Sequence, residues 1–311
     1  MIIRRLVKAG QASHTISLPK DWLDKHKLKK GDLVYLYEKD DNELLITPES
    51  KPDEPMPSKE ITISVDNKEL SSLQREITSA YINNYGTITL IGESITEKTP
   101  QIRKMLHDFV ALEVADQTSK SIIAKDLLNV KEISVDKTVR RMDMLVRSML
   151  QDSIKAVEEP GLAESVSMRD LEVNRAYFLM MRLLKSTFAS RKLAEIFQLS
   201  NEKVLNYYYL TINLENFADA AKQAVELIAK EKKKKNVKEL FKEVEKGYLD
   251  VMKAYFTKDK KLADSVALRR ADLVERIGAL PVGIAQLFKS MVTLTNNIAR
   301  LVIDEETQEG K

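Results

Sequence analysis

Apolar side chains recur at spacings of three and four residues through most of the chain from residue 135 to residue 305. This period places them on one face of an α-helix, so the segment is predicted to be almost continuously helical. After a first helix that ends at Pro160-Gly161, periodic stretches cover about 166–198, 201–234, 236–256, 259–277 and 282–303. Six helices indicate an antiparallel bundle of two three-helix halves, with a break near residues 232–236.

A proline-rich stretch separates the beginning of the chain from the rest. Four of the eight prolines (Pro48, Pro52, Pro55 and Pro57) fall within ten residues, among charged and serine residues. Such a segment forms neither helix nor sheet, and residues 49–59 are therefore predicted to be a semi-rigid linker. After this linker, residues 60–133 alternate between strand-like and helix-like patterns, which predicts a small α/β domain.

Residues 1–48 have the pattern of a small β domain punctuated by turns. Strands are predicted at 2–7, 13–18, 33–37 and 44–46, and a short helix begins at Pro19. A hairpin turn is predicted at Asp40-Asp41-Asn42. The fold class is therefore α+β multidomain: a β domain over 1–48, the linker, the α/β domain over 60–133 and the helical domain over 135–305.

Residue types exclude several kinds of function. Cysteine is absent, so disulfides, zinc–thiolate sites and thiol catalysis are excluded, and the three histidines are dispersed. No apolar run approaches the roughly 18 residues that a membrane span needs, and the N-terminus lacks a signal-peptide pattern. We find no glycine-rich phosphate loop and no catalytic triad pattern. A cytoplasmic, non-enzymatic protein that does not insert into membranes is expected.

The first thirty residues carry eight basic side chains against two acidic ones. Arg4, Arg5 and Lys8 lie on or after the first predicted strand, and Lys20 follows the second. A β unit this small buries little apolar area alone, so intertwining with a second copy is expected. A symmetric dimer would present paired rows of cations to the phosphates of duplex DNA. The alternative is that these are ordinary surface cations on a dimerisation hairpin.

Three runs in this segment resemble the AbrB/SpoVT swapped-hairpin family: Arg4-Arg5-Leu6-Val7-Lys8-Ala9-Gly10, Thr15-Ile16-Ser17-Leu18-Pro19-Lys20-Asp21-Trp22 and Leu28-Lys29-Lys30-Gly31-Asp32-Leu33-Val34. The resemblance covers nearly all of residues 1–48. It implies a homodimeric DNA-binding module with Arg4, Arg5, Lys8 and Lys20 as contacts. Ala9-Gly10-Gln11 departs from the family's pattern, in which Lys or Thr often precedes the glycine. The same fold also serves in other proteins purely to dimerise.

A pair of carboxylates, Glu215 and Asp219, lies one helical turn apart on the third predicted helix. At the edge of an apolar stripe, carboxylates need a cation, an arginine partner or water, because burying them unpaired is costly. A metal ion is one solution, since hard cations prefer oxygen ligands. A solvated or arginine-paired face is the other.

Residues 135–305 resemble the PhoU family of phosphate-transport regulators, whose halves carry helical Glu-x-x-x-Asp pairs around metal ions. Glu215-x-x-x-Asp219 followed by Ala220-Ala221-Lys222-Gln223-Ala224 matches one such motif. The resemblance implies a divalent or ferric ion held by Glu215, Asp219 and Asp170. The partner motif is degenerate, since Asn174 replaces its second acid. In the second half Lys289 and Thr293 stand where a carboxylate pair is expected, and Asp272 and Glu275 are the nearest acids.

These observations together predict a DNA-binding transcriptional regulator of phosphate uptake or homeostasis, in which the helical domain controls how Arg4, Arg5 and Lys8 engage DNA. A second hypothesis is a regulator that acts by protein–protein contact on a phosphate transporter or signalling partner, with the N-terminal domain only dimerising. A third is a metal-dependent hydrolase in the bundle.

Overall fold

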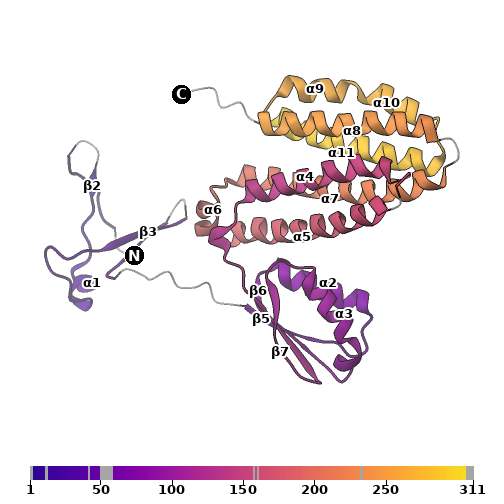
Figure 1. Ribbon diagram of the computed structural model, residues 1–311. Coiled ribbons are helices and arrows are strands. Elements are labelled where there is room, and N and C mark those ends of the chain that lie inside the picture. Colours follow the sequence, from indigo (N-terminus) through magenta and orange to yellow (C-terminus); the bar gives the residue numbers. More distant parts are fainter. Residues whose placement is uncertain are drawn as a thin grey trace. The chain divides into compact units, whose positions relative to one another are not determined.

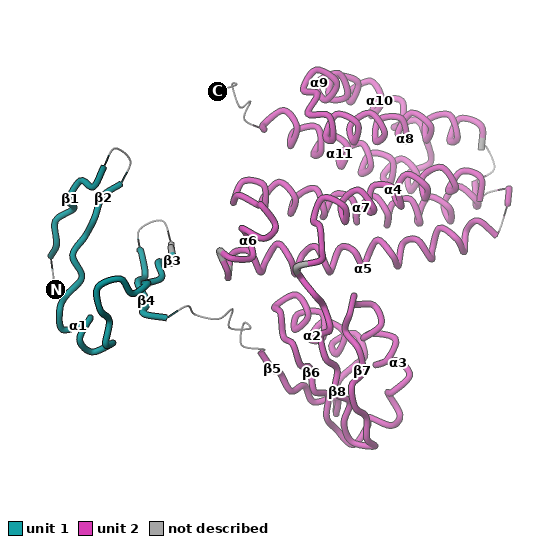
Figure 2. Tube along the Cα trace, turned by 60° about the vertical axis from the view of Figure 1, so that its left-hand side comes forward, with its two compact units in different colours: residues 1–57 teal, residues 58–311 magenta. Residues whose placement is uncertain are grey.

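The computed structural model describes residues 3–10, 13–40, 43–49, 59–156, 158–159, 161–231 and 234–305. The chain divides into two compact units, residues 1–57 and residues 58–311 (Figure 2). Most of the predicted linker, including Pro52, Pro55 and Pro57, lies outside the described residues, as do Asp41 and Asn42 of the predicted hairpin turn.

The first unit consists of two separate hairpins and one short helix. Strands β1 (Val7–Lys8) and β2 (His14–Thr15) pair antiparallel, and so do β3 (Tyr35–Asp40) and β4 (Glu43–Thr47). Helix α1 (Lys20–Lys25) begins after Pro19, as predicted. The first two strands are much shorter than predicted. A two-stranded hairpin with nothing packed on its faces is marginal, which accounts for the short pairing.

The second unit begins with a four-stranded mixed sheet and two helices. In chain order these are β5 (Lys59–Ser64), α2 (Leu70–Ile82), β6 (Tyr85–Ile91), α3 (Ile95–His107), β7 (Leu112–Gln117) and β8 (Ser121–Asp126). The sheet order is β5-β6-β8-β7; β5 and β6 are parallel and the other pairs antiparallel. Alternating apolar residues of the strands pack against the buried faces of the helices, as Ile88 and Leu90 do with Leu73 and Ile102.

The rest of the second unit is helical (Figure 1). A 3-10 turn, η1 (Val130–Glu132), leads into α4 (Val135–Lys155), α5 (Gly161–Ala189), α6 (Arg191–Phe197) and α7 (Asn201–Lys230). Helices α8 (Lys234–Thr257), α9 (Lys260–Leu268), α10 (Arg270–Ile277) and α11 (Val282–Asp304) follow. Helices α4 to α7 form a first half and α8 to α11 a second half, and α4 and α7 of the first half contact α8 and α11 of the second. The predicted fold class is confirmed.

Two of the six predicted helices are interrupted in the structure. The stretch predicted at 166–198 starts earlier, at Gly161, and breaks at Ser190, whose extended backbone and side-chain hydrogen bond to the Leu193 N–H start α6. The stretch at 259–277 breaks between Leu268 and Arg270. Arg269 keeps a helical backbone conformation there, so α9 and α10 are joined by a bend rather than a loop.

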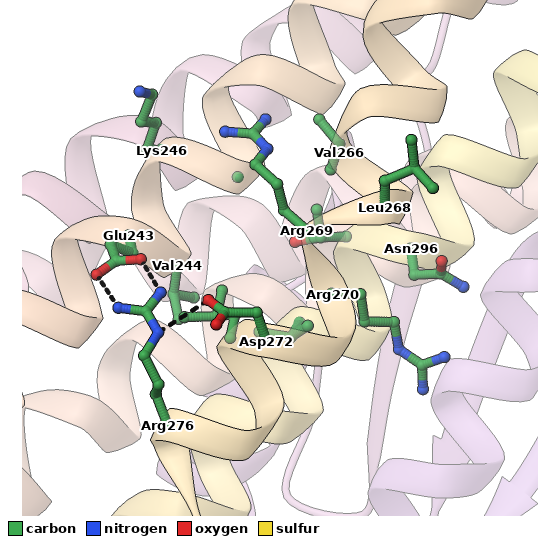
Figure 3. Close-up of a pocket in the computed structure, with 14 residues that line it drawn as sticks. Glu243, Val244, Lys246, Val266, Leu268, Arg269, Arg270, Asp272, Arg276 and Asn296 are labelled. Carbon is green, nitrogen blue, oxygen red and sulfur yellow. Dashed lines mark hydrogen bonds and ion pairs between the residues drawn. The ribbon is translucent and has the colours of Figure 1, made fainter.

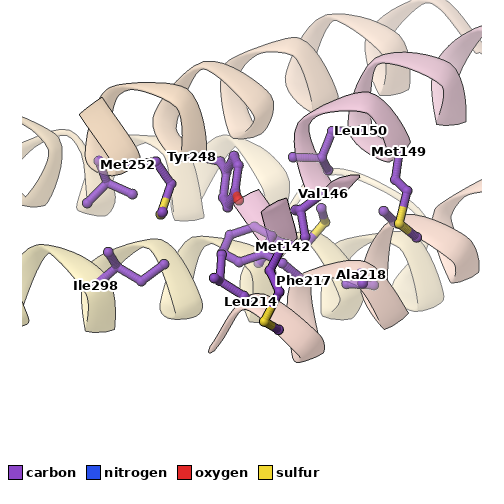
Figure 4. Packing of buried hydrophobic residues seen from close by; sticks show 14 of the residues in the cluster. Met142, Val146, Met149, Leu150, Leu214, Phe217, Ala218, Tyr248, Met252 and Ile298 are labelled. Atoms are coloured by element: carbon purple, nitrogen blue, oxygen red, sulfur yellow. The ribbon is translucent and has the colours of Figure 1, made fainter. Parts of the chain in front are cut away.

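One continuous apolar core runs through both halves. Figure 4 shows Met142 and Val146 of α4, Phe217 of α7 and Tyr248 of α8 packed against one another. The Phe217 and Tyr248 rings lie 4.6 Å apart, and the Tyr248 hydroxyl donates to the buried Asp143 carboxylate at 2.9 Å. None of the helices in the described ranges combines the length and apolar character needed to cross a membrane.

Candidate functional site

The first candidate site is the first unit, in which many large apolar side chains are exposed. Leu6 is 69% exposed and Leu33 is 74% exposed, and Leu36 and Leu44 on one face of the second hairpin are exposed as well. Neither apolar core of the protein includes any described residue of this unit. Folded proteins rarely leave most of a segment's large apolar side chains in water. We therefore expect another protein surface to cover the apolar side chains of this unit.

The predicted DNA contacts lie on the same unit. Arg4 and Arg5 precede β1, Lys8 ends that strand, and Lys20 is the first residue of α1; all four are exposed. Their side chains form no hydrogen bond or ion pair with another described residue. The four cations, here called the basic group, are therefore free to bind an anionic partner.

The second candidate site is the acidic cluster, formed by Asp170 of α5 with Glu215 and Asp219 of α7. The three residues predicted from the sequence lie close together, and their charges act on Glu215 and Asp219. Burial raises the pKa of Glu215 to about 7, and the charges of Asp219 and Asp170 contribute to the increase. Burial, followed by the charge of Asp170, also raises the pKa of Asp219.

A lysine lies within this cluster. The Lys222 ammonium, one turn after Asp219, donates to Oδ2 of Asp170 at 2.8 Å, and this bond raises the pKa of Lys222. The Asp170 side chain is only 2% exposed, and its Oδ1 is buried with no hydrogen-bond partner among the described residues. Sequence reasoning missed this pairing, although the spacing of Lys222 from Asp219 places both on one helix face.

The acidic cluster does not have the donor set of a metal site. Within the described ranges, no group of three or more His, Asp or Glu side chains is arranged to hold a metal ion. Lys222 supplies the positive charge that Asp170 needs, and Asn174 offers no second charge on α5. In the second half, the Thr293 hydroxyl donates to the backbone of Lys289, and Asp272 pairs with Arg276. The sequence left open a metal ion or a solvated or arginine-paired face; the geometry shows Asp170 paired with a lysine, Lys222.

Comparisons with known proteins agree with these two segments. Residues 12–54 match the family described as antidote-toxin recognition MazE, bacterial antitoxin. Residues 139–228 match the PhoU domain. No curated protein matches the chain. The chain thus combines a MazE-like segment with a PhoU domain, which confirms the predicted swapped-hairpin plus PhoU architecture. Both matched families are regulatory and non-enzymatic.

Proposed function

We propose that this chain is a cytoplasmic, homodimeric, DNA-binding regulator of phosphate uptake or homeostasis. The proposal rests on two features of one small unit: exposed apolar side chains, and four cations without an ion-pair partner in the described part of the chain. A second copy of the unit would bury the apolar surface, and an anionic partner would neutralise the cations. The PhoU match supports the link to phosphate.

A symmetric dimer makes the basic group suitable for DNA. Two copies of Arg4, Arg5, Lys8 and Lys20 are related by a two-fold axis, as are the two strands of a duplex. Arginine presents a planar fork of donors that matches phosphate oxygens, and its charge persists at every physiological pH. The PhoU domain would sense a signal or bind a partner and transmit the result to the N-terminal dimer.

A second candidate function is regulation by direct protein contact. It is favoured by the MazE match, because the description of that family names recognition of a toxin protein. In this alternative the first unit dimerises without contacting DNA, and a phosphate transporter or signalling protein is the partner.

Fluorescence anisotropy of the full chain with labelled duplex DNA, across a salt series, distinguishes the two. We expect binding that weakens steeply with salt. The double variant Arg4→Glu with Arg5→Glu removes two cations from each chain, four per dimer. If all four contact phosphates, the log–log salt slope falls by about 4, since each contact contributes roughly 0.9.

The matched control is Lys253→Glu with Arg300→Glu, which changes the net charge equally but on exposed positions of α8 and α11. It should bind DNA like the wild type, and sedimentation should find every variant dimeric. Absence of wild-type binding to any duplex at low salt, or equal losses in both double variants, would refute the DNA-binding proposal.

A further inference from the structure

The second half of the helical segment contains a pocket that the proposed function does not use. Residues of α8, α9, α10 and α11 enclose a cavity of about 620 Å³ (Figure 3). This volume lies within the range of roughly 300–1,000 Å³ that is typical of small-molecule sites. The pocket is far from the acidic cluster in sequence and shares no residue with it.

Two local features of the sequence open this pocket. The bend between α9 and α10 places Leu268, Arg269 and Arg270 at its edge, where a continuous helix would have presented one regular face. Gly247 lies opposite in the middle of α8, where glycine costs about 1 kcal/mol relative to alanine. A Cβ at Gly247 would lie 3.7 Å from the Thr295 methyl, at ordinary contact distance, so the backbone does not require glycine there. The absence of a side chain at Gly247 instead leaves space in the pocket.

The floor of the pocket is apolar. Val244, Val266 and Val292 line it, and all three are buried. Thr295, a buried polar residue that also lines the pocket, already donates its hydroxyl hydrogen to the Met291 carbonyl at 3.0 Å. The Thr295 hydroxyl hydrogen is therefore not available to a ligand at the floor. The part of the ligand that reaches the floor must be apolar, because a buried polar group without a hydrogen bond is costly.

The rim of the pocket is basic. Lys246, Arg269, Arg270 and Arg276 lie there with two carboxylates, Glu243 and Asp272. Both carboxylates bind Arg276 (Figure 3). Arg269 binds Asp250 at 2.8 Å.

Two of the rim cations remain available to a ligand. Among the described residues, the Arg270 and Lys246 side chains have neither an ion-pair nor a hydrogen-bond partner, although the charge of Lys246 acts on Glu243. The Asn296 side chain, also at the rim, can contribute an amide donor.

We propose that this pocket binds a small organic anion, with an apolar body on the valine floor and a phosphate or carboxylate group against Arg270. Apolar walls with a few convergent polar groups are the usual composition of a small-molecule site. A guanidinium at a partly enclosed rim suits an oxyanion, since charge-assisted hydrogen bonds are the stronger ones. The inference does not depend on DNA binding.

The test uses two fluorescent probes that share an aromatic body: 1-anilinonaphthalene-8-sulfonate, which is anionic, and N-phenyl-1-naphthylamine, which is neutral. We expect the full chain to bind the anionic probe at a saturable site. Arg270→Gln should weaken that binding by roughly tenfold, as expected for a lost charge-assisted contact, and leave the neutral probe unaffected. Phenyl phosphate and benzoate should displace the probe, and the tighter competitor identifies the preferred anionic group.

Gly247→Leu places a side chain inside the pocket and should weaken the binding of both probes, while circular dichroism checks that the variant is folded. If that variant does not fold, Arg270→Gln is sufficient by itself, because the Arg270 side chain is exposed and pairs with no described residue. Arg300→Gln removes a cation from exposed α11 outside the pocket and should bind like the wild type. Absence of saturable binding, or binding equally strong in Arg270→Gln and the wild type, would overturn the proposal.

Discussion

Glu215 is a partly buried carboxyl that changes charge near neutral pH. Its pKa is raised from 4.5 to about 7 in the folded chain by burial and by Asp219 and Asp170. Between these two values the unfolded state releases the proton and the folded state keeps it. Stability therefore falls as the pH rises from about 4.5 to about 7, and the full penalty applies above that window.

We therefore expect Glu215→Gln to be more stable than the wild type at pH 8 and nearly equal to it at pH 4.5. The gain at pH 8 should be about 1 kcal/mol, because water reaches part of this side chain and screens the repulsion. Urea unfolding at both pH values measures the difference. Glu239→Gln, at an exposed position of α8, is the control for removal of a carboxylate and should change the stability little. A gain of equal size at both pH values would contradict the assignment.

The Asp170–Lys222 pair makes a second prediction at this scale. Lys222→Met should destabilise the fold by about 3 kcal/mol, because Asp170 is left buried without its cation. The double variant Lys222→Met with Asp170→Asn should recover most of this loss, since no unpaired charge remains. Chemical unfolding of both single variants and the double variant gives the coupling energy. Additive losses would contradict a direct pairing.

At the scale of elements, one arginine of α5 joins the helical segment to the mixed sheet. Arg182 is 4% exposed, donates from Nε to Asn84 at 2.9 Å, forms a two-point contact with Asp126, and lies over the Tyr81 ring. Tyr81 lies in the last turn of α2, Asn84 in the turn that follows this helix, and Asp126 at the end of β8. A planar guanidinium can satisfy all of them at once, which an ammonium cannot.

We expect Arg182→Lys to destabilise the chain by about 3 kcal/mol, because lysine cannot form the two-point contact with the partly buried Asp126. Hydrogen exchange followed by mass spectrometry should then find reduced protection in α2 and β8. Arg141→Lys is the control, since Arg141 forms only an exposed ion pair with Glu172. Unchanged protection in α2 and β8 would show that the packing of Phe178 against Phe109 is sufficient to hold the sheet.

The elements also show which features were predictable from the sequence. Periodicity predicted the helices well, because α4, α7, α8 and α11 each bury one continuous stripe against the shared core. It did not predict the bend at Arg269, since the apolar period continues across it and the backbone stays helical.

Side-chain partners were harder to predict. Glu215 and Asp219 follow from helical spacing, and Asp170 from the family resemblance. The contacts of Arg182 do not, because its partners lie 98 and 56 residues away along the chain.

For the whole molecule, the central question is what covers the apolar surface of the first unit. Leu36 pairs with Ile46 across the second hairpin, and Leu44 lies on the same face two residues along β4. Leu36 and Leu44 are both exposed in the single chain. In an intertwined dimer four such leucines are buried, and each contributes about 1.5–3 kcal/mol.

The double variant Leu36→Gln with Leu44→Gln removes these contacts without changing the net charge. We expect it to lose at least about 6 kcal/mol of association free energy, which is more than a 10,000-fold increase in the dissociation constant. Sedimentation velocity at micromolar concentration should find monomers. DNA affinity should fall although Arg4 and Arg5 are intact, because one copy of the basic group meets half as many phosphates. Since the second unit keeps its own core, its thermal transition should not change. A variant that stays dimeric and binds DNA normally would mean that another surface holds the two copies together.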